Sequence, residues 1–180
     1  MKNQRSKTGT TAGLLLLGVA LSVLPISITS CSAFPRTRTE VTLFRQDCLP
    51  NTWCVTSIET EGRSSYLPVA SRLPEVLQSL AHGHGISILT ECPELNSGPG
   101  TLGLKVWIRE KEFVRNLESR SSITVMMSLH DVESGGEAAR ALYTEESGRT
   151  VESAYHLYAI VERLVGKLAR EIRKATKSSE

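Results

Sequence analysis

Residues 102–109 are Leu-Gly-Leu-Lys-Val-Trp-Ile-Arg, and an apolar side chain occupies every second position of this stretch. Residues 122–129, Ser-Ile-Thr-Val-Met-Met-Ser-Leu, show the same alternation. Alternation sustained over several residues predicts a β-strand with one buried and one more polar face. Two such strands indicate an antiparallel sheet that is covered on one side only.

The segments around these strands have the patterns of further strands and of two helices. Apolar residues recur at helical spacing in 68–81 and, over a longer stretch, in 151–175. Pro74 is expected in the first turn of the former, where its missing N–H does no harm. Strands are expected at 40–44, 53–59, 85–90 and 138–144. The sequence thus predicts an α+β fold, a two-layer sandwich of a mostly antiparallel sheet of about five to six strands covered by two helices, the longer at the C-terminus.

The N-terminus has the three parts of a secretory signal. Lys2, Arg5 and Lys7 precede an apolar stretch at 12–24, and small residues follow. A membrane-spanning helix needs ~20 mostly apolar residues, so a cleaved leader is favoured over a transmembrane segment. Residues 28–31, Ile-Thr-Ser-Cys, resemble the bacterial lipobox. In lipoproteins with this motif the cysteine thiol takes a diacylglycerol and its freed amine an acyl chain such as palmitate; an ordinary signal peptide is the alternative.

We therefore expect 1–30 to be a lipoprotein signal peptide, 31–39 a lipidated tether and 40–180 a single α+β domain. Acylated Cys31 would hold the domain to a lipid bilayer, since two or more acyl chains anchor stably. Ser32, and not Asp, follows this cysteine. That pattern resembles outer-membrane sorting in diderm bacteria, so we expect the domain to face the periplasm, with the outer membrane favoured over the inner.

The charge of the chain argues against a nucleic-acid partner. Three of the 21 basic residues lie in the leader, which has no acidic residue, so 18 basic face 19 acidic side chains in the remainder. The net charge of this part is about −1, and it has no basic patch of the kind that binds phosphate backbones.

Three cysteines remain besides Cys31. In an oxidising envelope Cys48 and Cys54 are the best-placed pair for a disulfide, which would close a short loop and leave Cys92 free. Three reduced thiols are equally compatible with the sequence. No CxxC spacing is present, so no zinc site is expected.

The polar motifs do not assemble into an active site. His82 and His84 form an incomplete metal site and are expected to lie at a helix end. His130 and Asp131 resemble half of a catalytic pair, but no GxSxG elbow supplies a nucleophile, and both residue types are common in turns.

Glu145 and Glu146 do not form a carboxylate pair for glycoside chemistry, because adjacent residues of a strand face opposite ways. With no catalytic residue, metal or cofactor indicated, we expect a protein that is not an enzyme.

The order of elements behind a lipobox resembles the ABC-type transport auxiliary lipoprotein family. The resemblance covers roughly residues 40–175. It lies in the helix at 73–80, the strand at 102–106, the hairpin of 122–129 and 140–145 around Asp131 and Gly135, and the long C-terminal helix. Members of this family lie in the envelope of diderm bacteria beside MCE-domain and ABC-transporter components, and they are associated with moving lipids or organic solvents.

This resemblance implies a membrane-anchored envelope lipoprotein that serves as a non-enzymatic accessory or scaffold of a transport system, with a periplasmic or envelope protein as its partner. One alternative is an assembly lipoprotein for the outer membrane or the cell wall, because lipopolysaccharide-assembly and peptidoglycan-synthase activator lipoproteins look similar. Another is a carrier of small apolar ligands, with a cavity lined by Leu77, Leu80, Val106 and Ile108.

An exposed sheet edge can bind a partner by adding a strand. The strand with Leu102, Leu104, Val106 and Ile108 is our candidate for such an edge, because its alternation is the clearest in the chain. The alternative is that it lies in the middle of the sheet.

Overall fold

The structure is a computed structural model and describes residues 36–45, 49–62, 67–92, 100–115, 117–147 and 154–178. All of them belong to one compact unit, Phe34–Glu180. The elements follow one another as β1 (Arg36–Leu43), β2 (Thr52–Glu61), α1 (Leu67–His82), β3 (Ser87–Leu89), β4 (Thr101–Arg115), β5 (Glu118–Asp131), β6 (Glu137–Ser147) and α2 (Ala154–Ser178). This order of strands and helices is the predicted one.

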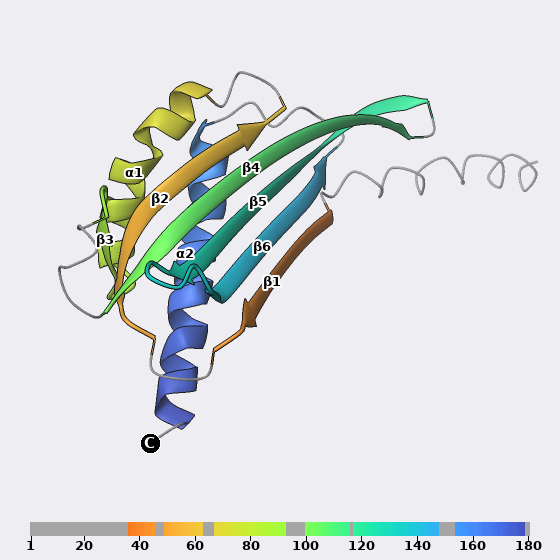
Figure 1. Cartoon of the computed structure of the whole chain (residues 1–180). Helices are drawn as coiled ribbons and strands as arrows, with labels where there is room; N and C mark the ends of the chain where they lie inside the picture. The colour runs from red at the N-terminus through yellow and green to blue at the C-terminus, as the bar shows by residue number, and fades with distance from the viewer. Residues whose placement is uncertain are drawn as a thin grey trace, which may run out of the picture. The chain divides into compact units, whose positions relative to one another are not determined.

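The six strands form one sheet in the order β1-β6-β5-β4-β2-β3. β1, β6, β5 and β4 pair antiparallel, whereas β2 runs parallel to both β4 and β3. Both helices lie on the same side of the sheet, and α2 is the longer (Figure 1). The predicted α+β two-layer architecture is therefore confirmed.

The core lies between the helices and the covered face of the sheet. β4 and β5 contribute Leu104, Ile108, Val125 and Met127 to it, each at most 1 % exposed, because alternate residues of a strand point to one face. The helices contribute residues three or four positions apart, which share one face of a helix; among them are Leu73, Leu77, Leu157, Val161, Leu164 and Leu168.

Three details of the predicted elements are wrong. β1 begins at Arg36, so residues 36–39 are not part of the expected tether; they pair with Tyr143–Glu146 of β6. Pro74 lies inside α1 and not in its first turn, because the helix begins at Leu67. The β4–β5 hairpin extends to Arg115 and Glu118, well past the predicted ends of both strands.

The prediction that the strand with Leu102, Leu104, Val106 and Ile108 forms a free edge is also wrong. β4 lies in the sheet between β5 and β2, and these four side chains are at most 3 % exposed. The reason is the parallel connection through α1, which brings β2 to the side of β4 that β5 leaves open. The edges of the described sheet are β1 and β3.

Candidate functional site: the open face of the sheet

The face of the sheet opposite the helices carries a row of three large side chains. The strand register places Trp107 of β4 opposite Met126 of β5, and Met126 opposite Leu142 of β6. All three are half-buried, although α1 and α2 pack on the other face. We call Trp107, Met126 and Leu142 the apolar row.

Polar and charged residues flank the apolar row on both sides. On one side the register aligns Lys105, Ser128 and Arg140; on the other it aligns Arg109, Thr124 and Thr144. The Arg109 guanidinium lies 5.8 Å from the centre of the Trp107 ring, which is within cation–π range. The apolar row is therefore a narrow strip within a charged surface.

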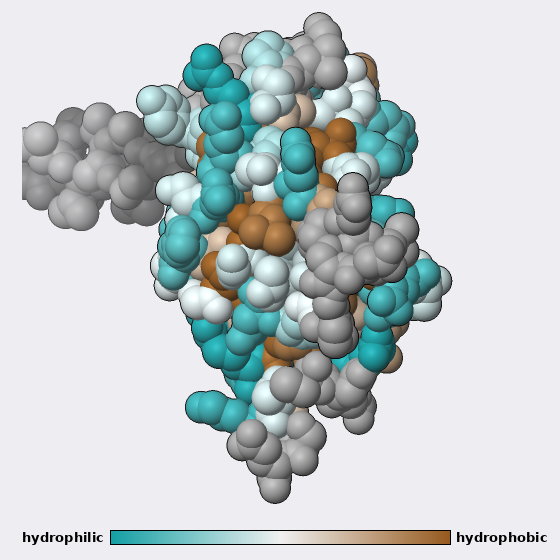
Figure 2. All heavy atoms as spheres, turned by 60° about the vertical axis from the view of Figure 1, so that its left-hand side comes forward, coloured by the Kyte–Doolittle hydropathy of each residue, from teal (hydrophilic) through white to brown (hydrophobic). Residues whose placement is uncertain are grey.

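Two hollows lie at the ends of the apolar row, each of about 320 Å³. The first is lined by Ser57, Glu59, Lys105, Val106, Trp107, Met126 and Ser128. The second is lined by Arg36, Thr37, Arg38, Glu40, Leu142, Thr144 and Glu146. Figure 2, which turns the side with α1 and β3 toward the viewer, shows hydrophobic residues in small groups separated by hydrophilic ones. On the open face, the apolar row with its polar flanks suits contact with a macromolecule, since interfaces combine an apolar centre with a polar rim.

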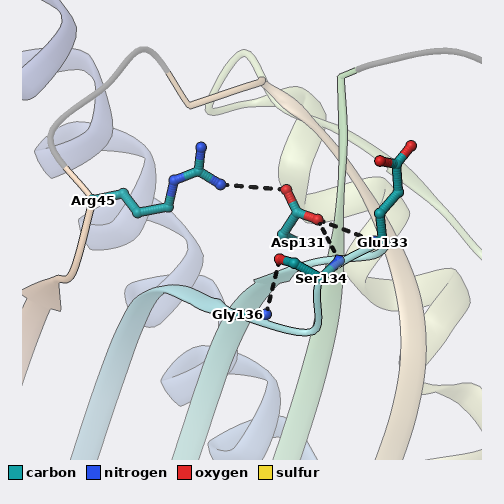
Figure 3. Close-up of polar contacts among 5 residues, drawn as sticks. All are labelled: Arg45, Asp131, Glu133, Ser134 and Gly136. Atoms are coloured by element: carbon teal, nitrogen blue, oxygen red, sulfur yellow. Dashed lines mark hydrogen bonds and ion pairs between the residues drawn. The ribbon is translucent and has the colours of Figure 1, made fainter.

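His130 and Asp131, the sequence candidates for half of a catalytic pair, each have a structural role. Asp131 accepts hydrogen bonds from the backbone N–H groups of Glu133 and Ser134, at 3.0 and 2.9 Å, and forms a 3.3 Å ion pair with Arg45 (Figure 3). The hydrogen bond from the Ser134 backbone is the main reason why the pKa of Asp131 lies below its usual range. The carboxylate thus stabilises the β5–β6 turn and holds the end of β1 against it.

His130 lies over Gly103 on the neighbouring strand. A Cβ on Gly103 would come within 2.4 Å of His130 Nε2, so the glycine leaves room for the ring. Burial lowers the pKa of His130, and the cationic Lys105 lowers it further. The register places the ring at the end of the open face, beside Cys54 of β2.

A second polar group, which sequence reasoning missed, lies between β6 and α2. The hydroxyl of Tyr143 donates to Glu145 Oε2 at 2.5 Å, and His156 Nε2 lies 3.0 Å from the same oxygen. Burial is the main cause that raises the pKa of Tyr143, and its hydrogen bond to Glu145 adds to this. Glu145 is only 5 % exposed, whereas Glu146 faces the second hollow, so the two carboxylates point apart as predicted. One feature of the sequence indicates this group: Glu145 occupies a position of β6 at which the alternation predicts an apolar residue.

His84, one of the two histidines considered for a metal, packs against helix α2. A Cβ on Gly166 would come within 2.8 Å of the His84 ring, and the His84 carbonyl accepts a 2.6 Å hydrogen bond from Arg173. The described residues contain no group of three or more His, Cys, Asp or Glu side chains that is placed to hold a metal ion.

The predicted Cys48–Cys54 disulfide is wrong. Cys54 is bonded to Cys92, with a Cα–Cα distance of 4.9 Å, and a cysteine forms only one disulfide. Cys54 is fully buried in β2, and the bond fixes the segment after β3 to that strand. Cys48 lies outside the described residues.

The predicted signal peptide and the predicted lipidation site at Cys31 also lie outside the described residues. Within the part of the chain that the structure describes, neither helix has the length and apolar character to cross a bilayer.

Comparison with known proteins gives distant structural similarity only. No family model and no curated protein matches the chain, so the resemblance to the ABC-type transport auxiliary lipoproteins stays a prediction. Among solved structures, a PelC dodecamer from Paraburkholderia phytofirmans is 15% identical, with a TM-score of 0.48 over 76% of this chain and 97% of that one. Lipoprotein GNA1162 from Neisseria meningitidis is 13% identical, with a TM-score of 0.39 over 67% of this chain and 99% of that one. Both are too distant to bear on what this chain does.

Proposed function

We propose that this chain is an envelope lipoprotein that works by contact and not by catalysis, with the open face of the sheet as its contact surface. The observation that carries the proposal is the apolar row of Trp107, Met126 and Leu142, which lies on the face that the helices leave uncovered. Side chains of this size on an uncovered face are typical of the centre of a binding site.

The chemistry around the apolar row supports binding over reaction. The groups that flank the apolar row are cations, carboxylates and hydroxyls. Two of the flanking cations already pair with carboxylates of this chain. Arg109 pairs with Glu61 at 3.4 Å, and Arg140 forms two hydrogen bonds with Glu137. His130 lies over Gly103 on this face, and its buried Nδ1 has no hydrogen-bond partner among the described residues.

For the role of this protein and the identity of its partner, we propose the function that the sequence favours. The anchor at acylated Cys31 would hold the domain at the periplasmic side of a membrane, with the outer membrane favoured. The partner would be a component of an ABC/MCE-type lipid-transport system, which this protein assists as a scaffold. The polar surroundings of the apolar row favour a protein partner over a free apolar ligand.

Site-specific photo-crosslinking in the native envelope tests this proposal. A benzophenone amino acid at Met126 places the probe in the apolar row, and the same probe at Glu162, an exposed position of α2, is the matched control. We expect the probe at position 126 to form an adduct with an ABC-transporter or MCE-domain protein. The probe at position 162 should form no such adduct.

Other outcomes overturn parts of the proposal. An adduct at 126 with a β-barrel protein or a peptidoglycan synthase would replace transport by assembly, and an adduct with lipid alone would identify a carrier. Equal labelling at positions 126 and 162, or labelling at neither position, would contradict the proposal that the open face is the contact surface.

A further inference from the structure

β1 forms one margin of the sheet and has β6 as its only neighbouring strand among the described elements (Figure 1). It is eight residues long, with the sequence Arg-Thr-Arg-Thr-Glu-Val-Thr-Leu. Four of these residues are β-branched, and none is Pro or Gly, so the strand has a high β propensity. Natural sheets usually protect an edge of this length, because its free backbone groups can pair with another strand.

The hydrogen-bond pattern shows which backbone groups face outward. Phe44 N–H donates to Ala138 at 2.9 Å, so Phe44 and Ala138 form a hydrogen-bonded pair. In an antiparallel ladder such pairs alternate, and the register of β1 on β6 keeps the same alternation. The even-numbered residues of β1 therefore turn their N–H and C=O groups toward β6, while Thr37, Thr39, Val41 and Leu43 turn theirs outward.

The side chains of β1 divide in the same way between the two faces. Arg36, Arg38, Glu40 and Thr42 share the open face with Leu142, which pairs with Glu40. Arg38 and Glu40 form an exposed ion pair within the strand. Val41 and Leu43 lie on the covered face, where they are only partly buried against the core. An additional strand at this edge would bury both of them further.

From this geometry we infer that β1 pairs antiparallel with β1 of a second copy of this chain, about a two-fold axis at Thr39. Two-fold pairing is the commonest symmetry of homo-oligomers. With Thr39 opposite Thr39 of the second copy, the outward-facing Thr37 meets Val41. On the open face Arg38 then lies opposite Glu40 of the second copy, and Glu40 opposite Arg38.

Charge complementarity selects this register over its neighbours. A shift of the axis by one residue in one direction places Arg38 opposite Arg38, and a shift in the other direction places Glu40 opposite Glu40. Like charges directly opposite each other destabilise a strand pair, whereas opposite charges stabilise it. The sheets of the two copies would form one continuous sheet, with their helices on the same side.

Disulfide trapping with the full chain in detergent micelles tests the register. In the proposed dimer the two copies of Thr39 are a hydrogen-bonded pair, with Cα atoms ~5.5 Å apart, so Thr39→Cys should give a disulfide-linked homodimer under oxidation. Thr37→Cys is the matched control, because the two copies of Thr37 lie four positions apart along the strand, ~13 Å. The parent chain shows any background from the native cysteines.

Charge reversal gives an independent test by sedimentation velocity. Arg38→Glu places like charges opposite each other twice and should weaken dimerisation ~10-fold. Arg38→Glu combined with Glu40→Arg restores both pairs and should restore the parent dissociation constant. Thermal unfolding of each variant shows that the domain is still folded.

The inference is overturned by a chain that stays monomeric, by a Thr39→Cys variant that cross-links no better than Thr37→Cys, or by a double charge reversal that fails to restore the dimer. A cross-link from Thr39→Cys to a protein of different mass would assign the edge to another partner. A closed ring of more than two copies would also overturn the inference, because a two-fold pairing of β1 with β1 joins only two copies.

Discussion

At the scale of single residues, His130 packs closely against Gly103 on the open face. A Cβ at position 103 would lie 2.4 Å from His130 Nε2 and 2.9 Å from the Thr56 methyl group. We expect Gly103→Ala to displace the imidazole and to lower the free energy of unfolding by about 1–3 kcal/mol, the usual cost of overpacking. Urea denaturation measures this difference.

Two variants test the cause of that loss. Gly83→Ala adds a methyl group where the nearest atom, the Leu80 carbonyl oxygen, is 3.6 Å away, so it should change stability little. His130→Ala introduced together with Gly103→Ala should recover part of the loss, since it removes the clashing ring. A double variant as unstable as the two changes added together would contradict the explanation.

The environment of His130 also predicts a pH dependence. Burial and Lys105 hold the pKa of His130 below its ordinary value of 6.5 in the folded state, while Asp131 and Glu137 oppose the shift. Between the folded-state pKa and 6.5 the unfolded chain binds more protons, so stability falls as the pH falls through this range. Asp131, whose pKa lies below 3.8, titrates in a more acidic range.

We therefore expect His130→Gln to reduce the loss of stability between about pH 8 and pH 5, measured by urea denaturation at each pH. The other histidines are present in both proteins, so their contributions cancel in the comparison. An unchanged pH slope in the His130→Gln variant would refute the assignment.

At the scale of elements, local patterns predict the kind and order of the strands but not their extent or their neighbours. The alternation of β4 and β5 is clear only where helices cover one face, as at Val106 and Val125. Beyond that point Lys111–Arg115 pairs with Glu118–Ser122 in a hairpin, in which Lys111, Glu112, Val114 and Ser119 are exposed, and the alternation is lost. The central place of β4 depends on the distant strand β2, which no local pattern reveals.

Distance along the chain also explains why the predicted Cys48–Cys54 disulfide is wrong. Cys54 and Cys92 lie 38 positions apart in the chain, with α1 and β3 between them, whereas Cys48 is close to Cys54 in the sequence. A loop of this length predicts a large effect of the bond. We expect reduction, or Cys92→Ala with Cys54→Ala, to lower the free energy of unfolding by about 4 kcal/mol, because the open chain gains conformational entropy.

Denaturation of the oxidised and reduced protein measures this effect, and peptide mapping without reductant identifies the bond. Cys48→Ala is the matched control, because the Cys54–Cys92 bond remains and stability should stay near that of the parent. A Cys48→Ala variant as unstable as the double variant would contradict the bond that we describe.

At the scale of the whole molecule, the core residues of the sheet and the proposed contact residues lie on opposite faces, because the helices cover one face only. The apolar row could be anticipated only in part, because Trp107 and Met126 stand at the polar positions of their alternating strands. Their alignment with Leu142 depends on the register of three strands, which the sequence does not specify locally. The same topology leaves β1 at an edge of the described sheet. The sequence of β1 alone only weakly indicates this edge position.

The proposed anchor at Cys31 lies outside the described residues, which include the whole described core. The described residues of the core cluster lie between Val41 and Ile172, and we expect a change at Cys31 to leave their packing intact. We expect Cys31→Ala to move the protein from the membrane to the soluble periplasmic fraction and to abolish palmitate labelling, with the thermal unfolding of the domain unchanged. The physical reason is that each buried CH₂ of an acyl chain contributes ~0.8 kcal/mol to membrane binding, and all of this is lost at once. Cys48→Ala, in the same fractionation, should stay with the membrane; palmitate labelling that survives Cys31→Ala would place the acyl chains elsewhere and remove the premise of a tethered domain.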